Sequence, residues 1–187
     1  MSHVTYIGSF AFHGCTNLEK VTFEDKSSLR SIGVGAFEDC PNIEEMTLPP
    51  SLEILEEFAF FYCINLEKKV TFEDGSLLRY IGEFAFYGCA IEVITLPPSL
   101  ETLGNVAFYG CTNLETLTLS PKLTTIDEYT FEGCCSSLIT VDEMQSIQSI
   151  GLDAFRGCDE LKEVTLNTDV DSITVDSFSP NTEIIRI

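Results

Sequence analysis

The chain has 187 residues, of which 44% are apolar, and it carries 30 acidic against 10 basic side chains, giving a net charge of −20. This apolar content excludes a disordered acidic tail, and the length is sufficient for a domain with a sizeable core. Nucleic acids and anionic membranes are recognised mainly through Lys and Arg, so we expect neither as a partner. No apolar stretch approaches the roughly 18–20 residues of a membrane helix, so we expect no membrane insertion. The start, Met1 to Tyr6, does not read as a signal peptide.

One segment, read as Ile-Gly-x-x-Ala-Phe, recurs along the chain in steps of 22 to 26 residues. It begins at Ile7, Ile32, Leu55, Ile81, Leu103, Ile126, Ile150 and Ile173. The fifth residue is always small: Ala11, Ala36, Ala59, Ala85, Ala107, Thr130, Ala154 and Ser177. The sixth is always phenylalanine: Phe12, Phe37, Phe60, Phe86, Phe108, Phe131, Phe155 and Phe178. Because stacked repeats bury such positions against their neighbours, we predict that these rings form a continuous spine in the core.

A cysteine follows this phenylalanine by three residues in most copies, at Cys15, Cys40, Cys63, Cys89, Cys111 and Cys158. The sixth copy has one extra residue, so we align Cys135 with the others and predict that Cys134 is an exposed insertion. The eighth copy has Asn181 instead. Since Asn replaces Cys there, we predict a ladder of buried free thiols that meet the backbone of the adjacent coil. The only histidines are His3 and His13, and no Cys-x-x-Cys motif occurs, so the sequence predicts no metal site and no cofactor.

After each cysteine the sequence alternates as Leu-x-x-apolar-Thr-apolar, for example over 18–23 and 114–119. This period of two predicts a short strand with one buried face, ended by Pro-Pro in two of the copies. The threonines in mid-strand should then point outward: Thr22, Thr47, Thr71, Thr95, Thr118 and Thr165. In the sixth copy either Asp142 or, after a local slip, Thr140 takes this position. A unit with one short strand cannot bury its apolar face alone, so the copies must stack into a parallel sheet.

The repeat resembles the BspA-like, or Treponema-type, leucine-rich repeat, read as L-x-x-I-x-L-P-x-x-L-x-x-I-G-x-x-A-F-x-x-C, from about Val4 to Ile187. The resemblance implies an α/β-type repeat solenoid, mostly of short parallel strands. It would form a right-handed arc of about eight coils, with a concave parallel sheet and a convex face of turns or one-turn helices. It also implies adhesion or protein binding at a cell surface. Free thiols are equally compatible with an intracellular location, so the sequence leaves the compartment open.

We expect residues 1–187 to form a single solenoid that is part of, or uncapped relative to, a longer array. The chain begins partway through a coil and ends where the eighth strand starts, and open coil ends favour end-to-end self-association.

Two surfaces are candidates for contact with a protein partner. The concave face would offer Lys20, Thr22, Glu45, Thr47, Lys69, Thr71, Thr95, Thr116 and Thr118. The convex flank would offer Phe58, Phe61, Phe84, Tyr87, Tyr109 and Tyr129, unless these rings are buried between adjacent turns. The leading hypothesis is a non-catalytic protein-interaction or adhesion module that uses the concave sheet. The alternatives are a structural subunit held by its aromatic flank and open ends, or a carbohydrate-binding module. No nucleophile, phosphate loop or metal triad is apparent, so we do not expect an enzyme.

Overall fold

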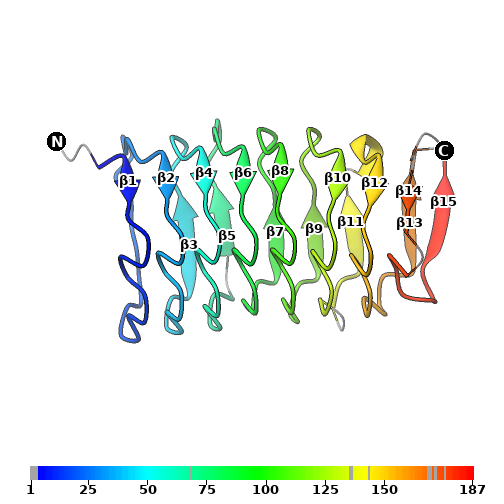
Figure 1. Ribbon diagram of the computed structural model, residues 1–187, viewed down its shortest axis with the longest axis horizontal. Coiled ribbons are helices and arrows are strands. Elements are labelled where there is room, and N and C mark those ends of the chain that lie inside the picture. The colour runs from blue at the N-terminus through cyan, green and yellow to red at the C-terminus, as the bar shows by residue number, and fades with distance from the viewer. Residues whose placement is uncertain are drawn as a thin grey trace.

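In the computed structural model the chain winds into a row of stacked coils, with the N- and C-termini at opposite ends of the row (Figure 1). The structure describes residues 4–67, 69–134, 137–142, 144–167, 170, 172–174 and 176–187. Two rows of parallel strands run along the stack, so each coil passes through one strand of each row in most of the molecule. The predicted parallel solenoid is therefore confirmed, with a second strand per coil that the sequence analysis does not predict.

The first row consists of two-residue strands, each ending on the first residue of a repeated segment. They are β1 (Tyr6–Ile7), β2 (Ser31–Ile32), β4 (Ile54–Leu55), β6 (Tyr80–Ile81), β8 (Thr102–Leu103), β10 (Thr125–Ile126), β12 (Ser149–Ile150) and β14 (Ser172–Ile173). Ladder hydrogen bonds join β1 through β8 into one sheet and β10, β12 and β14 into another. One short strand thus corresponds to each of the eight repeats read from the sequence.

The second row contains the strands predicted from the alternating pattern, and its outward side is called the long-strand face below. They are β3 (Glu45–Leu48), β5 (Lys69–Phe72), β7 (Val93–Thr95), β9 (Thr116–Thr118), β11 (Thr140–Asp142), β13 (Glu163–Leu166) and β15 (Glu183–Arg186). An isolated bridge from Val21 to Met46 extends the row into the first coil. The row is interrupted between β5 and β7 and between β11 and β13.

The first interruption coincides with a change in coil length, and the second with a short helix. The coil of β5 has one extra residue between Leu66 and Val70, and the next coil lacks one between Cys89 and Ile91. The 3-10 helix η1 (Met144–Ser146) lies between β11 and β13 in the chain. A ladder requires neighbouring strands in the same register, so an insertion beside a deletion breaks the hydrogen bonding locally. The apolar side chains still point inward, and Val70 and Ile94 are both buried.

The phenylalanines that occupy the same position in every repeat form the predicted spine in the centre of the stack. Successive rings from Phe12 to Phe178 lie 5.1–5.5 Å apart between centroids and within 11° of parallel. The six inner rings are completely buried, whereas Phe12 in the first coil is 39% exposed. Each inner ring is therefore packed between two others, and the first has a neighbour on one side.

The repeated Ala-Phe turn is held by backbone hydrogen bonds of two kinds. From Phe12 to Phe155, the amide of each phenylalanine donates a hydrogen bond to the carbonyl of the small residue in the following coil, with N to O distances of 2.7–2.9 Å. The amide of the preceding small residue closes the turn locally, as in Ala11 to Gly8 and Ala36 to Gly33. This alternation satisfies the turn backbone without a helix, which fits a convex side made of turns. Among the described residues, no helix is long and apolar enough to span a membrane.

Candidate functional site

The long-strand face carries the residues predicted for the concave surface. Burial alternates along β3, where Met46 and Leu48 are buried while Glu45 and Thr47 are exposed. Thr22 and Thr95 are exposed in the same way, and Thr71, Thr116 and Thr118 are half-buried. Lys20 and Glu45, in adjacent coils, form an ion pair of 3.2 Å. Lys69 is paired in register with Glu45, but its side chain lies outside the described part of the structure. The outward direction predicted for the threonine column is confirmed at these positions.

In the sixth coil the strand register decides between the two residues proposed for the threonine position. Asp142 pairs with Thr118 and Thr140 pairs with Thr116, so Asp142 occupies the threonine column and no slip occurs. A carboxylate therefore interrupts the hydroxyl ladder on the long-strand face at this point.

The break between β5 and β7 makes a hollow on the same side of the molecule. It is lined by Val70–Ser76, Val93 and Thr95–Pro98. Thr71 and Thr95, two of the predicted contact residues, lie on its opposite walls. The long-strand face is therefore an uneven polar surface with a hollow near its middle.

The aromatic residues predicted for the convex flank form one connected cluster across coils three to five. Phe58 stacks on Phe84 at 4.9 Å, Phe61 on Tyr87 at 4.9 Å, and Tyr87 on Tyr109 at 5.0 Å. Tyr62 belongs to the same cluster and packs edge-on against Phe61 at 4.6 Å and against Tyr87 at 5.4 Å. We call these six residues the aromatic flank: Phe58, Phe61, Tyr62, Phe84, Tyr87 and Tyr109. Tyr129 takes part in none of the ring contacts formed within the described chain.

The two alternatives predicted for the flank, rings buried between adjacent turns and rings exposed to solvent, are each correct in part. Tyr62 is 44% exposed, and the other five rings are half-buried against one another. Burial raises the pKa of the Tyr87 hydroxyl, with a smaller contribution from Tyr62 beside it. The flank is thus a row of stacked rings with their outer edges in solvent.

The backbone under this flank adopts a conformation that few side chains favour. The residue before each small residue has a positive φ in all eight coils, for example 57° at both Phe58 and Phe84. Glycine takes this conformation without steric cost, and the second coil has Gly35 there, with φ 58°. An aromatic residue at such a position costs on the order of 1–2 kcal/mol. The ring stacking offsets part of that cost, and the rings are placed at the surface as a result.

Acidic side chains border the aromatic flank. Glu57 precedes Phe58, and Glu83 precedes Phe84. The pKa of Tyr80, on the neighbouring short strand β6, is raised by burial and by the negative charges of Glu57 and Glu83. The flank therefore combines solvent-exposed ring edges with the negative field of nearby carboxylates, and that field favours cationic groups.

The thiol ladder is confirmed, and one assignment within it was wrong. Each buried cysteine from Cys40 to Cys158 donates its S–H to the phenylalanine carbonyl of the preceding coil, with Sγ to O distances of 3.0–3.5 Å. Cys134, predicted as an exposed insertion, is fully buried and bonds to the carbonyl of Phe108 at 3.2 Å. The extra residue of the sixth coil falls after Cys134 because only that placement preserves the spacing to Phe131. Cys135 lies outside the described residues.

Burial also keeps these thiols protonated. It raises the pKa of Cys63 to about 12, and it raises the pKa of Cys89 and Cys134 well above the ordinary value. Thiolates are the reactive form, so the ladder is a structural feature of the core. None of the seven described cysteines forms a disulfide.

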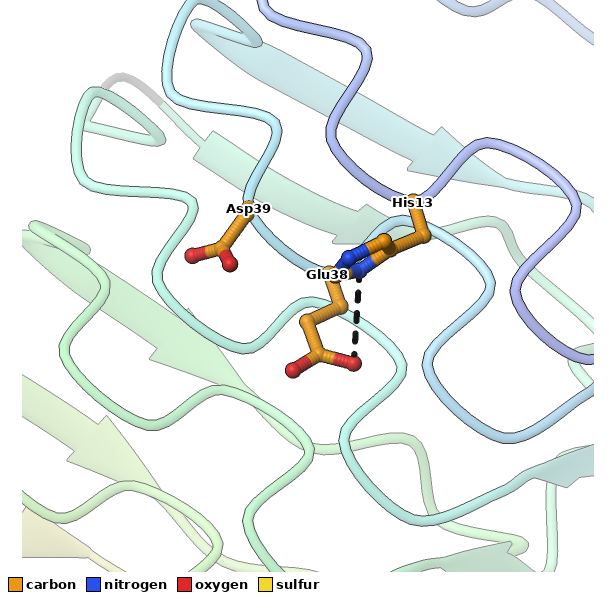
Figure 2. Close-up of side chains that lie close together, drawn as sticks. All are labelled: His13, Glu38 and Asp39. Atoms are coloured by element: carbon orange, nitrogen blue, oxygen red, sulfur yellow. Dashed lines mark ion pairs between the residues drawn. The ribbon is translucent and has the colours of Figure 1, made fainter.

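A third group of polar side chains lies near the N-terminal end of the stack. His13 and Glu38 occupy the same position in successive coils, one residue after the spine phenylalanine, and Asp39 follows Glu38. Figure 2 shows His13 directed toward Glu38, with Asp39 on the same turn. The imidazole Nδ1 of His13 lies 3.5 Å from Oε2 of Glu38, and one ligand atom from each of the three residues lies within 4.8 Å of the others.

The stacked coils, the phenylalanine spine and the Cys-to-backbone ladder define a leucine-rich-repeat solenoid built of parallel strands. The chain matches the family model of the BspA type leucine rich repeat region over residues 1–77 and 79–187, with six copies, and it belongs to this family. Proteins of this family are protein-interaction or surface repeat proteins.

Solved structures agree with this assignment. The Treponema pallidum leucine rich repeat protein TpLRR is 28% identical, with a TM-score of 0.76 over 84% of this chain and 72% of that one. A Bacteroides ovatus leucine-rich repeat protein is 25% identical, with a TM-score of 0.59 over 99% of this chain and 66% of that one. The pneumococcal vaccine antigen PcpA shares the fold at 20% identity and a TM-score of 0.56, over 98% of this chain and 66% of that one. No curated protein matches the chain.

Proposed function

We propose that this chain is a non-catalytic protein-binding module that holds a basic segment of a protein partner on its aromatic flank. The observation that carries the proposal is the connected cluster of six rings, exposed at its edge, in coils three to five. At Phe58, Tyr62 and Phe84 these rings stand on left-handed backbone, where glycine would be less strained. Strained positions that present large side chains at a surface are typical of binding sites.

The chemistry of the partner follows from the charge around the flank. Glu57 and Glu83 border the rings, and the whole chain has a net charge of −20. Arg and Lys side chains can lay their aliphatic stems along the ring edges and place their charged ends beside these carboxylates. An acidic partner would be repelled, so a segment with interleaved Arg, Lys and apolar residues fits best.

The test uses synthetic peptides in which Arg and Lys alternate with apolar residues, and matched peptides with Gln in place of the basic residues. We expect saturable binding of the basic peptides, weaker at high salt, and little binding of the Gln peptides. The double variant Tyr62→Asn, Tyr87→Ala should bind about tenfold more weakly, which corresponds to about 1.4 kcal/mol. Asn is chosen at Tyr62 because it tolerates the φ of 55°.

Tyr129→Asn is the matched control because Tyr129 has the same backbone geometry, with φ 58°, but lies outside the ring cluster. It should bind the peptides like the natural chain. Equal binding of basic and Gln peptides, or binding unaffected by the double variant, would refute the proposal. A soluble glycan that binds the flank in place of the peptides would instead favour the carbohydrate-binding alternative.

A second candidate surface is the long-strand face, favoured by its outward threonine column and the hollow between Thr71 and Thr95. Hydroxyls on neighbouring strands would accept and donate hydrogen bonds to a partner's polar groups. Replacing Thr47 and Thr71 with Glu changes this face and leaves the flank intact. Loss of peptide binding in that variant, with retention in the flank variant, would move the binding site to the long-strand face.

A further inference from the structure

We propose that His13, Glu38 and Asp39 form a binding site for a divalent first-row transition-metal ion such as Ni²⁺, Co²⁺ or Zn²⁺. The sequence analysis does not predict this site because its ligands come from two repeats. The stacking of coils one and two brings an imidazole nitrogen and two carboxylates together, with all three ligand atoms within 4.8 Å. Imidazole with carboxylates is a ligand set that suits these ions.

The distances fit a shared ion. Zinc bonds to nitrogen and oxygen ligands are about 2.0–2.2 Å long, so two ligands of a tetrahedral ion lie about 3.4 Å apart. Nδ1 of His13 and Oε2 of Glu38 are already separated by 3.5 Å. Asp39 is exposed, so its carboxylate is free to move inward by the small distance that a third bond requires. Water would complete the coordination, as in open metal sites.

Neighbouring residues contact the two closest ligands, although the His13 side chain is 47% exposed. The ring of Phe10 lies edge-on to the His13 imidazole at 6.0 Å. Gly35 lies against Phe10 and Glu38, because a Cβ at this position would lie 2.6 Å from the Phe10 ring and 2.7 Å from Oε2 of Glu38. The side chain of Glu38 is only 20% exposed. Because Glu38 is mostly enclosed, it loses less conformational entropy on binding, which favours the ion.

A bound ion would join the first coil to the second. The two coils are linked here by amides of Phe10, Phe12 and Gly14, which donate to carbonyls of the second coil over 2.8 Å each. Metal binding stabilises only the folded arrangement in which the ligands converge. We therefore expect it to slow the local opening of the first coil.

The experiment is a calorimetric titration of the reduced full chain with Ni²⁺ at pH 7.5. We expect one equivalent of Ni²⁺ to bind, and at least tenfold weaker binding in each of His13→Gln, Glu38→Gln and Asp39→Asn. Asn preserves the left-handed backbone of Asp39, φ 53°, so that variant removes charge without strain. His3→Gln, which changes the other histidine of the sequence, is the matched control and should bind normally.

Two further measurements keep the result decisive. Hydrogen exchange should show slower exchange of the Phe10, Phe12 and Gly14 amides with Ni²⁺ in the natural chain, and no change in His13→Gln. Co²⁺ absorption should lack the intense band of thiolate ligation. Failure to saturate, loss of binding in His3→Gln alone, or a thiolate band would each overturn the site. Because these probes do not involve the aromatic flank, failure here leaves the peptide-binding proposal untouched.

Discussion

Replacing Phe86 with alanine should be among the most destabilising single changes in the chain. The Phe86 ring is fully buried, 5.4 Å from the ring of Phe60 and 5.1 Å from that of Phe108. Its stacked neighbours are fixed by backbone hydrogen bonds, since the amide of Phe60 donates to the Ala85 carbonyl at 2.8 Å and that of Phe108 donates to the Thr130 carbonyl at 2.9 Å. The cavity therefore cannot collapse, and we expect a loss of about 3–5 kcal/mol in the free energy of unfolding.

The matched control is Phe12→Ala at the end of the spine. Phe12 is 39% exposed and has one stacked neighbour, Phe37, at 5.1 Å. With roughly half the buried contact, its loss should be about 1–2 kcal/mol. Phe86→Leu retains most of the apolar volume and should also cost about 1–2 kcal/mol, which provides a readable variant if Phe86→Ala does not fold.

Urea unfolding followed by far-UV circular dichroism and tyrosine fluorescence measures all three variants, because the chain has no tryptophan. In a solenoid each coil contacts only its neighbours, so Phe86→Ala should also split the transition into two as the halves uncouple. Equal losses for Phe86→Ala and Phe12→Ala, or a loss below about 1.5 kcal/mol for the former, would refute a spine that carries its stability ring by ring.

Three further changes test the packing between coils. Gly104→Ala should lower the free energy of unfolding by about 1–3 kcal/mol in thermal or urea unfolding, because the added Cβ would lie 2.5 Å from the backbone nitrogen of Glu83. Gly8→Ala is the control and should be close to neutral, because a Cβ there would lie 4.0 Å from its nearest neighbour. Equal losses in the two variants would contradict the steric explanation. Val106→Asn should raise the free energy of unfolding by up to about 1 kcal/mol, since β-branched valine is strained at φ 60°. A clear decrease in the free energy of unfolding would show that the burial of Val106 outweighs this strain. The free energy of unfolding should fall as pH rises above 9.0, because thiols ionise in the unfolded chain while they stay protonated in the fold, up to the pKa of Cys63 at about 12. Cys63→Ala should make this fall less steep by up to about 1.4 kcal/mol per pH unit. An unchanged slope would show that Cys63 does not contribute.

Much of this molecule was predictable because its information is repeated. A phenylalanine at the same offset in eight copies can only be a stacked core residue, and the alternation around Thr47 predicts which side of β3 is buried. Asn181 at a cysteine position predicts that the thiols contact backbone, which the bonds from Cys40 to Cys158 confirm. These features depend on local spacing and on the rule that every coil buries the same positions.

The sequence failed where an insertion had to be placed. Two adjacent cysteines match the pattern of the sixth coil equally well by type, and the alignment favoured Cys135. In the fold, the turn that begins at Phe131 has a fixed length set by its hydrogen bonds, so Cys134 is buried and the extra residue follows it. In the sequence the two spacings conflict, because the spacing from Phe131 favours Cys134 and the spacing to Leu138 favours Cys135. The hydrogen-bonded turn from Phe131 to Cys134 shows that the first spacing is the one the fold preserves.

By itself, then, the sequence determined the solenoid, the spine, the thiol ladder and the outward threonines, since each follows from one coil repeated. Only the tertiary structure decided which side chains of different coils meet. Residues some 25 positions apart in sequence become neighbours in space: His13 Nδ1 lies 3.5 Å from Glu38 Oε2, and the ring centroids of Phe58 and Phe84 are 4.9 Å apart. The surface chemistry of a solenoid depends on such neighbours across coils, because a single coil is too narrow to present more than one or two side chains on any face.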